Sequence, residues 1–263
     1  MLNWENWKRF SSARIGLGRS GGSVTTSDLL KFRLDHAKAR DAVLVEPNFE
    51  NLRSQAENLG SKFGIQTSFV SSLARDRKEF LLRPDLGRRL SSSSRDELKG
   101  ISGKCDILIC AVDGLSATAL ETNLIPFMQL LLESFDSKPW KLGPIVLARL
   151  GRVALGDEIG EVLNAKAVVV IIGERPGLSS SDSLGVYLTY GPKIGMTDEL
   201  RNCISNIRPG GLELSQAVLK TNYLLSEAFA KKISGVALKD EMLPEFLLEK
   251  GPKTSERREL KKE

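Results

Sequence analysis

The feature that most constrains the fold is a regular alternation of apolar runs and helical patterns between residues 101 and 235. Short continuous apolar runs predict buried strands at Asp106–Val112, Pro144–Arg149 and Ala167–Ile172. Helical patterns are found at Leu124–Phe135, Leu155–Leu163 and Leu212–Ile233. Strands that alternate with helices form βαβ units, and continuous apolar strands indicate helices on both faces of the sheet. The sequence therefore predicts an α/β fold, a Rossmann-like parallel sheet covered on both faces, for residues 101–235.

The rest of the chain predicts two further segments. Residues 1–100 form a mostly helical N-terminal segment, with expected helices at Ser27–Arg40 and Phe49–Phe63, a strand at Thr67–Val70 and a serine-rich loop at 91–94. Within residues 101–235, Ser183–Tyr190 is also strand-like. Residues 236–263 form a C-terminal tail, whose alternating charges at 249–263 predict disorder.

Composition excludes several classes of function. The longest apolar stretches have six residues, against about 20 for a bilayer span, and the N-terminus lacks the apolar core of a secretory signal. We therefore expect a cytoplasmic protein without membrane contact. The single histidine, His36, rules out a site with several histidine ligands, and none of the three cysteines forms a CxxC pair. The net charge of +5 is dispersed and aromatics make up only 6%, so we expect no nucleic-acid partner.

Two N-terminal features leave alternatives open. The loop Arg14–Gly22 has the Gly16-x-Gly18-x-x-Gly21 spacing of a dinucleotide fingerprint, but no apolar strand precedes it and the helix begins only near Thr26. A structural turn, or a loop that lets a ligand approach the backbone, is favoured over nucleotide binding. Trp4, Trp7 and Phe10 have the spacing of a short amphipathic turn, which docks either on the chain's own core or on a partner.

Candidate binding residues follow the predicted strands. The segments Asp113–Ser116, Leu150–Val153 and Gly173–Gly177 come directly after three of them and are rich in glycine and charge. Ligands of open parallel sheets bind at the carboxyl ends of the strands, so these loops should face one crevice. Glycine there lets backbone approach a ligand, and Asp113, Arg152 and Glu174 can hydrogen-bond polar groups. Ordinary turns, with an internal Glu–Arg pair in the third loop, are the alternative. Three loops at one rim favour a binding site.

The same loops carry a family resemblance. Five segments resemble those of the ethanolamine ammonia-lyase small subunit, in the family's order: Arg83–Leu90, Asp113–Ser116, Gly151–Val153, Gly173–Leu178 and Cys203–Ile207. Arg14–Arg19 and Leu34–Ala37 also match, and the resemblance spans roughly residues 13–236. The stretch between Tyr190 and Cys203 departs from the family in being about one residue shorter.

The resemblance implies adenosylcobalamin as cofactor and a large catalytic subunit as partner. In the family the large subunit is a barrel that converts ethanolamine to acetaldehyde and ammonia by a radical route. The corrin of the cofactor lies between the two subunits. Cobalt is base-on there and takes no protein histidine, in agreement with the absence of an Asp-x-His-x-x-Gly motif from this sequence. The resemblance therefore implies no catalytic residue and no protein ligand to a metal in this chain.

By the same resemblance, Val153, Glu174 and Cys203 contact the cofactor, with Arg152 and Gly173 beside them. Valine can pack on the apolar corrin disc, the carboxylate can accept hydrogen bonds from rim amides, and cysteine is a small, soft contact. A Rossmann-type nucleotide-dependent enzyme and a non-catalytic interaction protein are the alternatives. The sequence leaves open the subunit stoichiometry, packaging inside a bacterial microcompartment, and the role of the tail.

Overall fold

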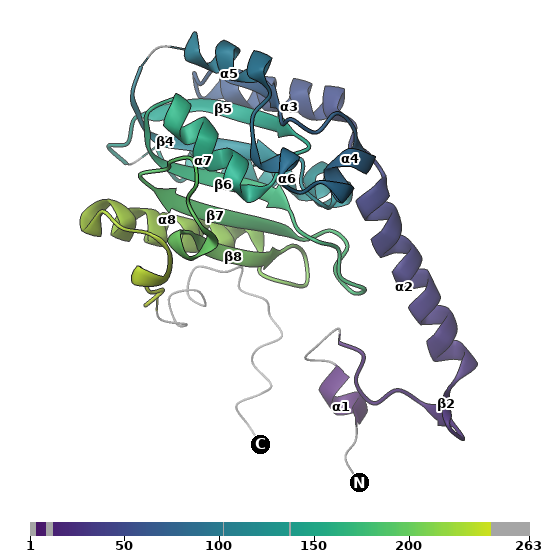
Figure 1. Cartoon of the computed structure of the whole chain (residues 1–263). Coiled ribbons are helices and arrows are strands. Elements are labelled where there is room, and N and C mark those ends of the chain that lie inside the picture. Colours follow the sequence, from purple (N-terminus) through teal and green to yellow (C-terminus); the bar gives the residue numbers. More distant parts are fainter. Residues whose placement is uncertain (1–3, 9–12, 102, 137, 243–263) are drawn as a thin grey trace.

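The fold is built on one six-stranded sheet (Figure 1). The computed structural model describes residues 4–8, 13–101, 103–136 and 138–242. Along the sheet the strands follow the order β3-β5-β4-β6-β7-β8. Their bounds are Thr67–Ser71 for β3, Cys105–Val112 for β4, Leu142–Arg149 for β5, Ala165–Gly173 for β6, Leu184–Tyr190 for β7 and Asn202–Ile207 for β8.

Five of the six strands run in one direction, and β7 runs against them. β3, β5, β4 and β6 run parallel, whereas β7 is antiparallel to β6 and β8 is antiparallel to β7. The predicted α/β sheet is confirmed as mostly parallel. The chain direction reverses from β6 to β7 and again from β7 to β8, because neither connection contains an α-helix. A parallel connection needs a crossover, which is usually an α-helix.

Helices cover both faces of the sheet, as predicted (Figure 1). One face packs against α3 (Phe49–Lys62), α6 (Ala117–Glu133) and α8 (Leu214–Lys231), and the other against α5 (Ser92–Lys99) and α7 (Val153–Val162). Alternate residues of β4 supply the two cores: Ile109 belongs to the first, and Leu108 and Cys110 to the second. Both sides of this strand are therefore buried, which explains its continuous apolar run.

Local capping corrects two expected elements, the start of α6 and the loop at 91–94. Ser116 Oγ accepts a hydrogen bond from the Ala119 N–H (3.0 Å), so α6 begins at Ala117 rather than near Leu124. Ser91 Oγ accepts one from the Ser94 N–H, which starts α5 where the serine-rich run predicted a loop. β8 was not predicted, because three of its six residues are exposed and no apolar run marks it.

The N-terminal segment extends away from this body (Figure 1). It contains α1 (Trp4–Lys8), the antiparallel pair β1 (Arg19–Ser20) and β2 (Ser23–Val24), and α2 (Thr26–Leu44). Only Ala39 and Ala42 of α2 are buried. Trp4 and Trp7 are about half exposed, and Phe10 lies outside the described residues.

The remaining short elements are α4 (Arg77–Leu82), η1 (Leu86–Arg88), η2 (Asp198–Leu200) and η3 (Gly235–Ala237). β3, α3 and α5 belong to the sheet body, so residues 1–100 contribute a strand and two covering helices to it. The predicted disorder at 249–263 lies outside the described residues. Within the described part of the chain, every helix is too short or too polar to cross a bilayer.

Candidate functional site

A cavity of about 510 Å³ opens at the carboxyl ends of the parallel strands. It brings together the three loops that the sequence singled out, those after β4, β5 and β6. The loop after β4 leads to α6 on one face and the loop after β5 leads to α7 on the other, the arrangement in which open α/β sheets bind ligands. The lining residues are Arg88, Gly114, Leu115, Arg152, Val153, Ala154, Ile172, Gly173, Glu174, Arg175, Tyr187 and Asp198.

Two glycines allow the loops after β4 and β6 to touch. A Cβ atom on Gly114 would lie 2.4 Å from the Gly173 carbonyl oxygen, and one on Gly173 would lie 2.2 Å from the Ser116 carbonyl oxygen. The Leu115 N–H donates to the Gly173 carbonyl oxygen at 2.9 Å. These glycines therefore serve the packing of one loop on another, whereas the sequence suggested that they give a ligand access to backbone.

Arg152 and Val153 start α7 at the cavity wall. The Arg152 N–H donates to the Gly87 carbonyl oxygen at 2.7 Å, and its guanidinium lies 4.2 Å from the centre of the Phe80 ring. Arg152 Nη2 donates to the Phe80 carbonyl oxygen, whereas its buried Nε has no partner among the described residues. Burial, and then the nearby charge of Arg175, lowers the pKa of Arg152. Val153 is half-buried and lines the cavity.

Glu174 connects β6 to the last two strands. Its Oε2 accepts hydrogen bonds from Ser183 Oγ (2.5 Å) and from the Asn206 N–H (3.1 Å). Oε1 accepts no hydrogen bond from the described residues, nor does Glu174 form an ion pair with Arg175 there. The alternative of an internal Glu–Arg pair is therefore not seen, and one oxygen of a cavity-lining carboxylate remains without a donor.

Cys203 lies beside the cavity rather than in its wall. It is an exposed residue of β8, opposite Tyr187 in the β7–β8 ladder. The polar stretch before it suggested a surface loop or a helix end; the exposure is confirmed and the secondary structure is corrected. Tyr187 does line the cavity, and burial, then the neighbouring Cys203, raises its pKa. Cys203 could therefore reach a ligand only at the cavity's edge.

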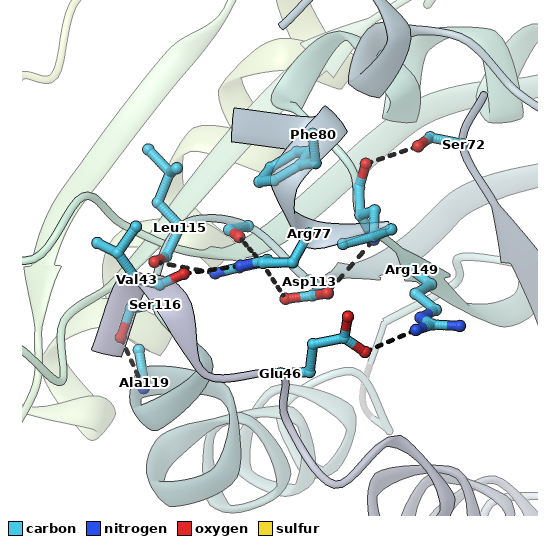
Figure 2. Close-up of polar contacts among 12 residues, drawn as sticks. Val43, Glu46, Ser72, Arg77, Phe80, Asp113, Leu115, Ser116, Ala119 and Arg149 are labelled. Carbon is cyan, nitrogen blue, oxygen red and sulfur yellow. Dashed lines mark hydrogen bonds and ion pairs between the residues drawn. The ribbon is translucent and has the colours of Figure 1, made fainter. Parts of the chain in front are cut away.

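Asp113 does not point into the cavity. Its side chain is 1% exposed and faces inward, where Oδ1 accepts a hydrogen bond from Arg77 Nη1 at 3.1 Å (Figure 2). Burial raises the pKa of Asp113 to about 6 in spite of the Arg77 charge. The expectation that Asp113 hydrogen-bonds a ligand is therefore wrong.

Known proteins are similar to this chain over most of its length. Residues 2–239 match the family described as Ethanolamine ammonia-lyase light chain (EutC). The chain belongs to this family. Ethanolamine ammonia-lyase small subunits from Azotobacter vinelandii and Pseudomonas fluorescens are 47% and 46% identical to it, over 90% of this chain and 88% and 86% of theirs. The one from Rhodopseudomonas palustris is 48% identical over 90% of both chains. The resemblance inferred from five short segments is confirmed.

Four of the five light-chain segments contribute residues to the cavity wall, and sequence reasoning had not assigned two of the lining residues, Arg88 and Tyr187. Arg88, from the segment Arg83–Leu90, lines the cavity from η1. The signal for Arg88 was its place in a family segment. Tyr187 had no such signal, because strand pairing alone brings it there. Arg88, Arg152 and Arg175 against Glu174 and Asp198 leave the wall with a net positive charge.

The described residues of this light chain contain no group of three or more His, Cys, Asp or Glu side chains that could hold a metal ion. The one histidine, His36, is exposed on α2, which projects from the sheet body (Figure 1). The glycine-rich loop forms the β1–β2 pair and its turn, and α2 begins only after β2. That geometry differs from a dinucleotide site, in which a buried strand leads directly into a helix.

Proposed function

We propose that this chain is the small subunit of an ethanolamine ammonia-lyase and that its cavity holds part of adenosylcobalamin against a large catalytic subunit. The complex would convert ethanolamine to acetaldehyde and ammonia, as a carbon–nitrogen lyase. Membership of the light-chain family and relatives named as small subunits support a two-subunit enzyme. The assignment of the cofactor to this cavity rests on the site itself.

The observation that carries the proposal is the convergence of Val153 and Glu174 on one open cavity at the switch of the sheet. Its volume of about 510 Å³ is within the range of about 300–1,000 Å³ that suits a drug-sized ligand. A corrinoid is considerably larger, so only part of it could lie here. A partner chain would have to cover the rest, as expected for a cofactor between two subunits.

The chemistry of the wall fits a corrinoid. Val153 supplies an apolar surface for the flat ring, and the free Oε1 of Glu174 can accept a hydrogen bond from an amide on the ring's edge. The arginines of the wall suit the single phosphodiester of the cofactor's nucleotide tail. Gly173 shapes the wall, and Cys203 lies at the edge beyond Tyr187.

This chain's own residues would bind and orient. When bound, adenosylcobalamin supplies the radical through homolysis of its cobalt–carbon bond. The loops after β4, β5 and β6 would fix the ring edge, and Val153 and Leu115 would keep water from the covered part of it. We assign no catalytic residue and no metal ligand to this subunit.

Reconstitution tests the proposal. The purified chain, the purified large subunit and their mixture are each assayed for ammonia release from ethanolamine with adenosylcobalamin. We expect activity, and a red corrinoid that co-purifies with protein, only in the mixture. Turnover by the isolated chain, or full activity of the large subunit alone, would contradict the assignment.

A further inference from the structure

Asp113 joins the loop after β4 to the loop after β5 through both its side chain and its main chain. Its N–H donates to the Ala148 carbonyl oxygen at 2.8 Å, and its carbonyl oxygen accepts from the Gly151 N–H at 2.9 Å. The carboxylate Oδ2 accepts from the Leu150 N–H at 3.4 Å, and Oδ1 accepts from Arg77. One residue, itself outside the cavity wall, therefore fixes two of the three loops that form it.

Arg77 holds the other side of the same loop. This α4 residue is 5% exposed, and its Nη1 donates to the Gly114 carbonyl oxygen at 2.7 Å as well as to Asp113. Nη2 donates to the Leu115 carbonyl oxygen at 3.2 Å, and Nε donates to the Val43 carbonyl oxygen at 2.7 Å (Figure 2). The planar guanidinium thus binds both cavity-lining residues that follow Asp113, and lysine could not reproduce this fork.

Leu150 shows that this arrangement works against backbone preference. Its φ of 55° lies in the left-handed region, which costs a leucine about 1–3 kcal/mol. The conformation is held from both sides: its N–H faces Asp113 Oδ2, and its carbonyl oxygen accepts from Ser72 Oγ at 2.7 Å. The turn at Leu150 leads through Arg152 into Val153, the first residue of α7 and part of the cavity wall. Strain of this kind persists where the surroundings over-determine it, often at binding sites.

We propose that Arg77 and Asp113 are positioning residues that set the shape of the cofactor cavity without touching its ligand. Together they fix Gly114 and Leu115 directly, and Val153 through the strained Leu150 turn. The inference rests on the proposed function, since it assumes that the cavity binds a corrinoid. It adds two residues that the sequence either assigned wrongly, as with Asp113, or did not assign, as with Arg77.

The test uses the assembled two-subunit complex and titrates it with adenosylcobalamin. Asp113→Asn keeps the shape of the side chain and removes the charge that orients Arg77; Arg77→Lys keeps the charge and removes the fork. We expect each variant to weaken cofactor affinity by about tenfold or more. The reason is that each loses a hydrogen bond to a charged group that holds the cavity loops in place. Assembly with the large subunit should stay close to wild type. The double variant should be little worse than either single variant, because the pair acts as a unit.

Asp106→Asn is the matched control. Asp106 lies at the amino end of the same strand, β4, where it pairs with Lys166 at 2.7 Å, away from the cavity. The control should bind cofactor as wild type does. Val153→Arg, which places a long side chain in the cavity, reports on the proposed function: it should abolish cofactor binding.

A pH titration keeps the proposal testable even where a variant folds poorly. Asp113 faces the charges of Arg77 on α4 and of Glu46 before α3, and Glu46 in turn pairs with Arg149 of β5 at 2.6 Å. With its pKa raised to about 6, Asp113 is ionised at pH 7 and protonated at pH 5. Wild-type cofactor affinity should therefore fall several-fold over that interval, and the fall should be absent from Asp113→Asn.

Three results would overturn the inference. Wild-type affinity in folded Asp113→Asn and Arg77→Lys complexes, with binding lost in Val153→Arg, would remove the positioning role and leave the cavity's function intact. Wild-type affinity in all of them, Val153→Arg included, would remove the proposed function and the inference with it. A fall in affinity between pH 7 and pH 5 that is as large in Asp113→Asn as in the wild-type complex would also contradict the positioning role.

Discussion

Replacement of Glu174 should separate its structural role from cofactor binding. In Glu174→Ala both hydrogen bonds to Oε2 are lost, those from Ser183 Oγ and from the Asn206 N–H. Hydrogen bonds to charged groups contribute about 1.5–3 kcal/mol each, but Asn206 is exposed and its N–H can rebind water, whereas Ser183 is buried, so we expect about 2 kcal/mol of destabilisation. For a domain of this size that lowers Tm by about 4–8 °C. Glu174→Gln keeps an acceptor oxygen for these donors and should lose less than about 1 kcal/mol.

Cofactor affinity should respond differently. Both variants lose the charge on Oε1, the oxygen that accepts no hydrogen bond from the residues that the structure describes. We expect about tenfold weaker adenosylcobalamin binding for Glu174→Gln and about 10- to 100-fold for Glu174→Ala. Binding is measured by titration of the assembled complex, and stability by thermal unfolding of the small subunit. Glu161→Gln is the control, because Glu161 accepts from the Ile194 N–H at 2.8 Å but does not line the cavity.

The result that would refute this reasoning is a Glu174→Gln complex with wild-type affinity. If, in addition, Glu174→Ala lost stability while its surviving complex still bound cofactor normally, Glu174 would be a purely structural residue. The β6–β8 connection would then be its whole role.

Three further predictions concern stability and exposure. A thiol reagent should modify exposed Cys203 before the two buried cysteines of the free subunit, and assembly with cobalamin and the large subunit should protect it; equal labelling in both states would remove it from the site. Asp157→Ala should destabilise the subunit by about 2–3 kcal/mol in urea titrations, since the Arg201 side chain, only 2% exposed, loses its buried carboxylate and keeps only the exposed Asp198 and the Met196 carbonyl oxygen; a loss below about 1 kcal/mol would contradict this. Gly173→Ala should cost about 1–3 kcal/mol and weaken cofactor binding, because the added Cβ meets the Ser116 carbonyl oxygen; unchanged stability would show that the loops can separate freely.

Sequence reasoning located the fold and the rim of the cavity because both depend on local patterns. Val169 and Ile109 lie in continuous apolar runs, which result from burial on both faces of the sheet. Glycine and charge directly after such strands mark the binding edge of an open sheet wherever it occurs. Patterns within single segments, an apolar run or a loop rich in glycine and charge, were sufficient for these predictions.

The direction of Asp113 and the contribution of Tyr187 depend on contacts between distant segments. Nothing near Asp113 indicates that Arg77, from an unpredicted short helix, turns its carboxylate inward. Tyr187 reaches the cavity only because β7 pairs antiparallel with β6, and no local feature specified that direction. The αL turn at Leu150 was also hidden, since leucine disfavours it and only tertiary contacts enforce it.

The central claim, that cobalamin lies on these three loops, is tested most directly by hydrogen–deuterium exchange of the assembled complex with and without adenosylcobalamin. We predict slower amide exchange at 113–116, 151–154 and 173–175 when the cofactor is bound. Exchange in α2 (Thr26–Leu44) should not change. Protection confined to the large subunit, with unchanged exchange in all three loops, would contradict the account.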